Sequence, residues 1–231
     1  MKHTALKHQL LNTPIPEQTR TYKPISHKEL IDLTLESIHQ SGFKVEKEKY
    51  SSAKDGNVAN GKYVIENVKD SEMQLQIAWQ NSYDKSLTLK FALGVNIMIC
   101  ENGCVSGDFG SFKKKHVGDI QTFTPDAITE YIKRSGEVFE IMQRDKNQLK
   151  RIQINDKLSA AVLGRLFFNE DVITSSQMNI IKDQIKNPTY DYNSPGSAWE
   201  LYNHVTYAMR STHPSYWIDK HKDLHNFFMS N

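Results

Sequence analysis

The chain has 231 residues, with 29 Lys or Arg against 27 Asp or Glu, so its formal charge is only +2. Hydrophobic residues make up 38% and aromatic residues 10%, which excludes collagen-like, mucin-like and wholly disordered classes. No window approaches the roughly 18 consecutive apolar residues of a membrane span, and the first residues lack the apolar core of a signal peptide. We therefore expect a packed protein that stays in the cytoplasm, without a membrane partner.

The first 25 residues are expected to form an irregular N-terminal arm. They show no hydrophobic period, and the prolines of Thr13–Pro16 and Lys23–Pro24 oppose a helix there. Ser26 and Glu29 then have the spacing of a capping box, and apolar residues follow at helical intervals as far as Gly42. This pattern predicts an amphipathic helix over residues 26–42.

From Phe43 the apolar residues alternate, as they do in strands. Four strand-like runs, separated by turn signals, cover residues 43–50, 62–68, 73–81 and 87–99. The connections leave no room for crossover helices, so neighbouring strands should be antiparallel and form a meander. The nearly continuous apolar run Val95–Cys100 predicts a central strand covered on both faces.

The helical period returns after Thr124 and Pro125, which we interpret as an N-cap and a first-turn proline. One long helix should reach about Lys150, with Gly136 as its weak point. Further helices are expected over 158–168, 175–185 and 197–211, and an aromatic segment over 216–228 should pack back on the body. The fold class is therefore α+β. An antiparallel meander is preceded by one helix and followed by a long helix and a helical C-terminal part, with the parts divided as 1–25, 26–152 and 153–231.

The two cysteines, Cys100 and Cys104, are read as buried small hydrophobes at a strand end and turn. A zinc site needs four ligands, and His116 is the only histidine nearby in sequence. His221 and His225 have the spacing of a helical metal pair, but a solvated amphipathic tail explains them better. We therefore expect no metal and no cofactor.

Five short motifs occur over residues 81–206: Asn81–Ser86, Gly94, Ile99–Gly103, Lys115-His116 and Trp199–Thr206. In this order they resemble a phage- and plasmid-associated family called domain of unknown function 932. Its members carry an Asn-Ser-His-Asp-Gly-Ser turn, a strand ending in Cys-Ser-Asn-Gly, a basic residue before His, and a Trp-x-x-Tyr-Asn-x-x-Thr helix. Tyr83 and Lys85 stand here where the family has His and Gly. The resemblance implies a phage or mobile-element origin, a bacterial host cell, and a role in DNA maintenance or host interaction. The matching residues are Asn81, Ser82, Asp84, Gly94, Cys100, Asn102, Gly103, Lys115, His116, Trp199, Tyr202, Asn203 and Thr206.

Several of these residues have both a chemical and a structural interpretation. Asp84 with His116, or Cys100 with His116, has the composition of a small hydrolase site. Asn, Ser and Asp also close tight turns through their own backbone, which we favour for residues 81–84. Trp199 and Tyr202 are expected in the core, with Asn203 capping a neighbouring segment. The sequence shows no established catalytic signature, so we lean away from an enzyme.

A mild basic patch favours nucleic acid as the partner. Residues 113–151 contain nine Lys or Arg and six Asp or Glu, and begin with Lys113, Lys114, Lys115 and His116. Single-strand binders combine such charge with aromatic stacking, for which Phe112, Tyr83 and Phe109 lie close in sequence. A meander followed by a long helix is also similar to the core of phage single-strand annealing proteins.

We therefore predict a protein that binds single-stranded or remodelled DNA, in replication or recombination, through Phe112 and residues 113–116. The first alternative is a non-enzymatic protein that binds a host protein, as an anti-defence factor, through the proline-containing arm or the loop 190–192. The second is a small hydrolase that uses Asp84, Cys100 and His116. Salt dependence of binding separates the first two, since phosphate contacts release counterions.

Overall fold

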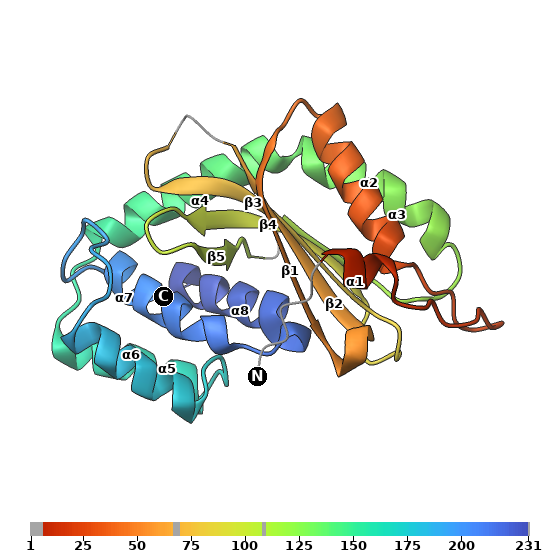
Figure 1. Ribbon diagram of the computed structural model, residues 1–231. Coiled ribbons are helices and arrows are strands. Elements are labelled where there is room, and N and C mark those ends of the chain that lie inside the picture. The colour runs from red at the N-terminus through yellow and green to blue at the C-terminus, as the bar shows by residue number, and fades with distance from the viewer. Residues whose placement is uncertain (1–6, 67–69, 108–109, 231) are drawn as a thin grey trace.

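The computed structural model describes residues 7–66, 70–107 and 110–230 and has the predicted α+β fold (Figure 1). The described helices are α1 (Lys7–Leu11), α2 (His27–Gln40), α3 (Ile120–Lys133), α4 (Ser135–Arg151), α5 (Asp156–Phe168), α6 (Ser175–Lys186), α7 (Ala198–Ala208) and α8 (Trp217–Ser230). The strands are β1 (Val45–Ala53), β2 (Val58–Ile65), β3 (Met73–Ser82), β4 (Leu89–Ile97), β5 (Asn102–Val105) and β6 (Ser111–Lys114). Short 3-10 turns are η1 (Lys54–Gly56), η3 (Met209–Ser211) and η4 (Pro214–Tyr216).

The sheet is an antiparallel meander in the order β1-β2-β3-β4-β5, which confirms the expected topology. Strand β6 also pairs with β4, along Leu89–Ala92, while β5 pairs with Gly94–Ile97. The two short strands therefore share one edge of β4. Every residue of β4 is buried, as expected of a central strand covered on both faces.

The two faces of the sheet carry different side chains because residues alternate along each strand. One face is apolar: Met73, Leu75, Ile77 and Trp79 of β3 belong to the main hydrophobic core. Helices α3 and α4 pack on β4, with α2 beside α3 (Figure 1). The opposite face, here called the polar face, carries Asn60, Lys62, Gln74, Gln76, Gln80, Lys90 and Asn96.

A second helical layer covers this polar face. Helices α7 and α8 pack on β5, and η4 packs on β1 and β2. The Pro214 carbonyl accepts a hydrogen bond from Asn60 Nδ2 at 2.9 Å and another from Gln80 Nε2. Trp217 and Ile218 form a small apolar cluster with Ala78, Ala92 and Val105. Helices α5 and α6 flank this layer on its outer side, with α6 against α7 (Figure 1).

Three expectations need correction. The arm contains the short helix α1, and its Leu10, Tyr22 and Ile25 are buried. The long helix is two helices divided at Arg134, and its first half starts at Ile120, so Pro125 lies inside it. The buried Ile120 anchors this extra turn, and the Thr124 hydroxyl donates to the Ile120 carbonyl at 2.6 Å instead of capping the helix.

The last correction concerns α8, which is not a solvated tail. His221 and His225 are buried, along with the aromatic residues of the same helix. His225 Nε2 lies 3.0 Å from Asp145 Oδ2 of α4, and the His221 ring lies 4.6 Å from that of Trp217. The buried face of α8 therefore includes both histidines. Their polarity alone had suggested that they are exposed to solvent, which is why the sequence pattern placed them wrongly.

Candidate functional site

The turn between β3 and β4 has structural roles for its motif residues. Asn81 is fully buried, and its Nδ2 donates to the Ile25 carbonyl at 2.9 Å and to His27 Nδ1 at 3.0 Å. The Ser82 hydroxyl is bonded to the backbone of Leu87 across the hairpin. These contacts join the strand ends to the start of α2, so they confirm the structural interpretation of the turn.

Asp84 closes the same turn as a carboxylate. Its Oδ1 accepts from the Ser86 backbone at 3.0 Å, and its Oδ2 lies 2.6 Å from Lys54 Nζ. Burial raises the pKa of Asp84, but the hydrogen bonds from Lys54 and Ser86 outweigh it and lower this pKa to about 2. A carboxylate with so low a pKa is a poor general base near neutral pH.

The three residues of the hydrolase alternative do not form one site. Asp84 precedes β4 and Cys100 follows it, so the nine residues of β4 separate them by roughly 25 Å. His116 is buried near Tyr22, with ring centroids 5.8 Å apart, at the Asp84 end. Burial lowers the pKa of His116.

The predicted nucleic-acid segment lies on the edge strand β6. Lys113 and Lys115 are exposed, whereas Lys114 Nζ pairs with Asp119 Oδ1 at 2.7 Å. The Phe112 ring is stacked on Phe91 at 5.5 Å and lies 4.9 Å from Tyr131. Existing aromatic contacts therefore occupy this ring, which sequence reasoning had assigned to base stacking.

The other two aromatic candidates differ. Tyr83 is buried and stacked on His27, with centroids 4.0 Å apart and planes 7° apart, and its hydroxyl accepts from the His27 backbone. Tyr83 thus belongs to the core beneath the turn. Phe109 lies outside the described residues.

The second group of motif residues meets where β5 packs against α7. Asn102 is buried, and its Nδ2 donates to Thr206 Oγ1 at 3.2 Å and to the Asn203 carbonyl at 3.5 Å. Its Oδ1 accepts from Arg210 Nε at 2.6 Å. Asn102 therefore joins the sheet edge to α7 and fixes the orientation of Arg210.

Trp199, Tyr202 and Asn203 lie on α7 and are buried, as expected. The first two are core residues, and their rings stack with centroids 5.7 Å apart. Asn203 does not cap a neighbouring segment: its Nδ2 donates to the Trp199 carbonyl of its own helix at 2.8 Å. The neighbouring segment instead supplies Asn102, which bonds to the Asn203 carbonyl.

The cysteines are free, buried thiols on either side of this junction. Burial raises the pKa of Cys100 and raises that of Cys104 to about 12. Both groups are therefore protonated at neutral pH, and neither has the low pKa of a nucleophilic thiolate. Among the described residues, no group of three or more His, Cys, Asp or Glu is placed to hold a metal ion.

Gly103 is required because neighbouring side chains approach its Cα closely. We would expect a glycine in this turn to have a positive φ, and the structure corrects that expectation. The residue with the left-handed backbone is Glu101, at φ 52°, and Gly103 is not among the positive-φ glycines. A Cβ on Gly103 would lie 2.7 Å from Gln76 Oε1 and 3.0 Å from Trp217 Cζ2. A side chain here would push α8 away from the polar face.

We expect Gly103→Val to lower the free energy of unfolding by about 1–2 kcal/mol, because the larger residue overpacks this contact. Chemical denaturation followed by circular dichroism measures the change. Gly164→Ala, in open space on α5, is the control and should not destabilise the protein, because it meets no neighbour and alanine favours a helix more than glycine does. An unchanged midpoint for the Gly103 variant would contradict this close packing.

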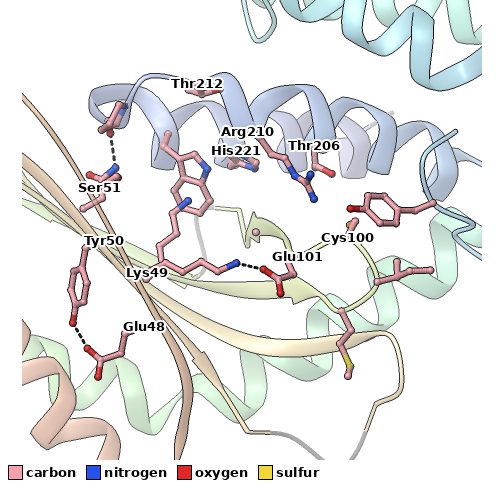
Figure 2. A pocket seen from close by; sticks show the side chains of 18 of the residues that line it. Glu48, Lys49, Tyr50, Ser51, Cys100, Glu101, Thr206, Arg210, Thr212 and His221 are labelled. Carbon is pink, nitrogen blue, oxygen red and sulfur yellow. Dashed lines mark hydrogen bonds and ion pairs between the residues drawn. The ribbon is translucent and has the colours of Figure 1, made fainter. Parts of the chain in front are cut away.

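An open cleft of about 980 Å³ lies between the polar face and the second helical layer, next to the Asn102 junction. We call it the sheet–helix cleft. Figure 2 shows Thr206, Arg210 and His221 extending into it from the helical layer, opposite Lys49 and Glu101 on the sheet. Residues that line it include Lys7, Glu48, Lys49, Tyr50, Asn60, Lys62, Met98, Ile99, Cys100, Glu101, Gly103, Tyr190, Thr206, Arg210, Trp217 and His221.

Cations and aromatic rings are paired in this cleft. Lys62 Nζ lies 3.3 Å from the centroid of the Trp217 ring. The Arg210 guanidinium carbon lies 4.5 Å from the Tyr207 ring and 5.9 Å from that of Tyr190. Asn60 Oδ1 is buried at the cleft and has no hydrogen-bond partner among the described residues.

The cleft residues outside the motifs were missed by sequence reasoning. Asn60 and Lys62 alternate with apolar residues of β2, a pattern that signals a polar strand face but not what covers it. Arg210 stands four residues after Thr206, one helical turn along the same face. This spacing is the sequence pattern that could have placed Arg210 beside Thr206.

A comparison with protein families gives one match. The model of the family described as Domain of unknown function (DUF932) matches residues 17–222, which include both motif clusters and the cleft residues named above other than Lys7. Searches of the curated proteins and of the solved structures gave no match. No helix in the described ranges is long and apolar enough to cross a membrane. The match spans most of the chain, and the protein belongs to the domain of unknown function 932 family.

Proposed function

We propose that this protein binds single-stranded nucleic acid in the sheet–helix cleft. The observation that carries the proposal is the presence of two cation–aromatic pairs whose members line one cleft, Lys62 with Trp217 and Arg210 with Tyr190. Single-strand binders combine positive charge that follows the phosphates with rings and apolar groups that contact the bases. At about 980 Å³ the cleft is at the upper end of ligand-pocket sizes, large enough for one or two nucleotides.

The charge balance of the cleft supports an anionic ligand. Its lining has four Lys or Arg and two Glu. Both glutamates are paired with lysines: Glu48 with Lys7 at 2.8 Å, and Glu101 with Lys49 at 2.6 Å. The residues that line the cleft therefore carry an excess of two positive charges.

The groups that would contact bases are of two kinds. Met98 and Ile99, at the tip of the β4–β5 hairpin, are 42% and 48% exposed and form an apolar rim beside Tyr190. Asn60 Oδ1 offers an unused acceptor to a base amino group. Contacts of this kind favour unpaired bases, whose faces and edges are accessible, over duplex.

The β6 edge is a second candidate surface for the same function. Lys113 lines a smaller cavity of about 160 Å³ with Lys90, Lys222 and Asp219. Of the rings assigned to stacking there, Tyr83 is packed in the core and Phe112 is already stacked on Phe91, so among the described residues this edge offers charge without an accessible ring. We therefore place the principal contacts in the cleft and treat Lys113 and Lys115 as the comparison.

The proposal is tested by fluorescence anisotropy with a labelled single-stranded oligonucleotide at several salt concentrations. Lys62→Met keeps an aliphatic chain over Trp217 and removes the charge, so we expect severalfold weaker binding. The salt slope should fall by about 0.7 for the lost phosphate contact. Lys182→Met on α6 removes the same charge from an exposed position far from the cleft and should change neither quantity.

The double variant Lys113→Met with Lys115→Met locates the surface. A larger loss from this variant than from Lys62→Met would move binding to the β6 edge. Failure of the folded wild type to bind any oligonucleotide at low salt would overturn the proposal and favour a host-protein partner.

A further inference from the structure

The inner end of the sheet–helix cleft has the features of a receptor for one phosphate group, and this inference rests on the proposed function. Arg210 extends into the cleft from η3, immediately after α7 (Figure 2). Its guanidinium is half-buried and is held by neutral groups: Asn102 Oδ1 at 2.6 Å and the faces of Tyr207 and Tyr190. Among the described residues no carboxylate pairs with it.

The orientation of Arg210 leaves its strongest donors available. Asn102 bonds to Nε, the inner nitrogen of the guanidinium, so the two terminal nitrogens are not used by this contact. Two terminal nitrogens of one planar group match two oxygens of a phosphate. Because the orientation is fixed by Asn102 and two rings, little side-chain freedom is lost on binding.

Glu101, which lies across the cleft from Arg210 (Figure 2), is already neutralised. Glu101 on the opposite hairpin pairs with Lys47 at 2.5 Å and Lys49 at 2.6 Å. The hydrogen bonds from Lys47 and then Lys49 lower the pKa of Glu101 to about 2, so it stays ionised and bound to these lysines. An anion near Arg210 therefore faces a group of net positive charge.

The helical layer and the sheet are in direct contact beside Arg210. Helix α7 packs directly on β5, and the hydrogen bond from Asn102 to Thr206 joins the two elements at 3.2 Å. A continuous strand that passes Arg210 would have to break this junction, whereas a chain end would not. We infer that Arg210 binds the terminal phosphate monoester of a nucleic acid strand, or of a mononucleotide, with Asn102 as its positioning residue.

The test compares three forms of one labelled oligonucleotide of about ten nucleotides: with a 5′-phosphate, with a 3′-phosphate, and with neither. Wild type should bind one phosphorylated form more tightly than the unphosphorylated form, on the order of tenfold. Arg210→Gln should abolish this preference. Arg210→Lys should retain only part of it, because lysine keeps the positive charge but lacks the two terminal nitrogens of a planar guanidinium. Lys182→Gln should retain it fully.

Asn102→Asp separates positioning from simple charge. The new carboxylate would form an ion pair with Arg210 and neutralise its charge. The preference for an end phosphate should therefore fall although the arginine remains. Thermal unfolding of each variant verifies that the protein measured is folded, and Arg210→Gln decides the matter if Asn102→Asp fails to fold.

Failure of this inference is distinguishable from failure of the proposed function. Equal binding of all three forms by wild type would overturn the phosphate receptor and leave single-strand binding in place. Binding of a nucleoside monophosphate that depends on Arg210, with no oligonucleotide binding, would overturn the proposed function and support the receptor. Binding of neither probe would overturn both.

Discussion

A Gly94→Ala variant is expected to lose about 3 kcal/mol or more of its free energy of unfolding, which is a large effect for the addition of one methyl group. Gly94 lies in β4 opposite Val105 of β5. A Cβ at this position would lie 1.9 Å from the Cys104 carbonyl oxygen and 2.9 Å from Val105 Cα. Both are backbone atoms, which cannot move aside as the end of a flexible side chain can.

Relief of that clash would require β5 to shift as a unit. Asn102 stands at the start of β5, so the shift would also disturb its bonds to Thr206 and Arg210. We therefore expect Gly94→Ala to weaken ligand binding as well as stability. This links the glycine, which is part of the family resemblance, to the geometry of the cleft.

Gly136→Ala provides the matched control, since it adds the same methyl group in open space on α4. It should stabilise the protein by about 0.5–1 kcal/mol, because alanine favours a helix more than glycine does. Urea denaturation of both variants measures the two changes. Similar midpoints for Gly94→Ala and wild type would show that β5 does not lie against Gly94.

The second large effect is a loss of stability on acidification that depends on His27. Burial lowers the pKa of His27 to about 4, from its ordinary value of 6.5, against a smaller opposing effect of its bond to Gly56. Between these values the unfolded chain binds the proton and the folded protein does not, so stability rises with pH. It should therefore fall as pH drops from about 6.5 to 4, by about 3 kcal/mol from this residue.

The hydrogen bonds of His27 explain why the neutral ring is required. Its Nε2 lies 2.9 Å from the Gly56 carbonyl and must donate to it. Its Nδ1 accepts from Asn81 Nδ2 at 3.0 Å, and the same Asn81 amide donates to the Ile25 carbonyl. Protonation of Nδ1 would place two donors against each other inside the core. Asn81, a family-motif residue, thus selects the neutral form.

Urea denaturation of wild type and of His27→Gln at pH 7.5, 5.5 and 4.5 measures this effect. The variant should be less stable at pH 7.5 but should lose less on acidification, so its slope against pH is flatter. Some slope should remain, because burial also lowers the pKa of His116 and His204. Equal slopes in the two proteins would contradict a buried, neutral His27.

The family motifs therefore divide between two physical tasks. At one end of β4, Asn81 holds the strand end against α2 and the arm, and Ser82 and Asp84 close the turn. Asn102, Gly103 and the α7 residues hold the second helical layer on the polar face, at the other end. The second group borders the sheet–helix cleft, which is lined by Lys62 and Arg210.

The local sequence determined the class of the fold and most of its elements. The N-cap at Ser26, the alternating runs of the meander and the short turns between them are local signals, and the structure confirms them. The continuous apolar run in β4 also predicted a strand covered on both faces. Such patterns depend on neighbours within one or two turns of chain, so they can be read without tertiary contacts.

Only the tertiary structure decided which residues meet. The burial of His221 and His225 in α8, the start of α3 at Ile120 and the stacking of Phe112 on Phe91 depend on side chains distant in the sequence. The cleft arises in the same way, since Asn102 contacts Arg210 across 108 residues of chain. A basic run such as Lys113–Lys115 is conspicuous in sequence, whereas an oriented arginine exists only once β5 and α7 have packed together.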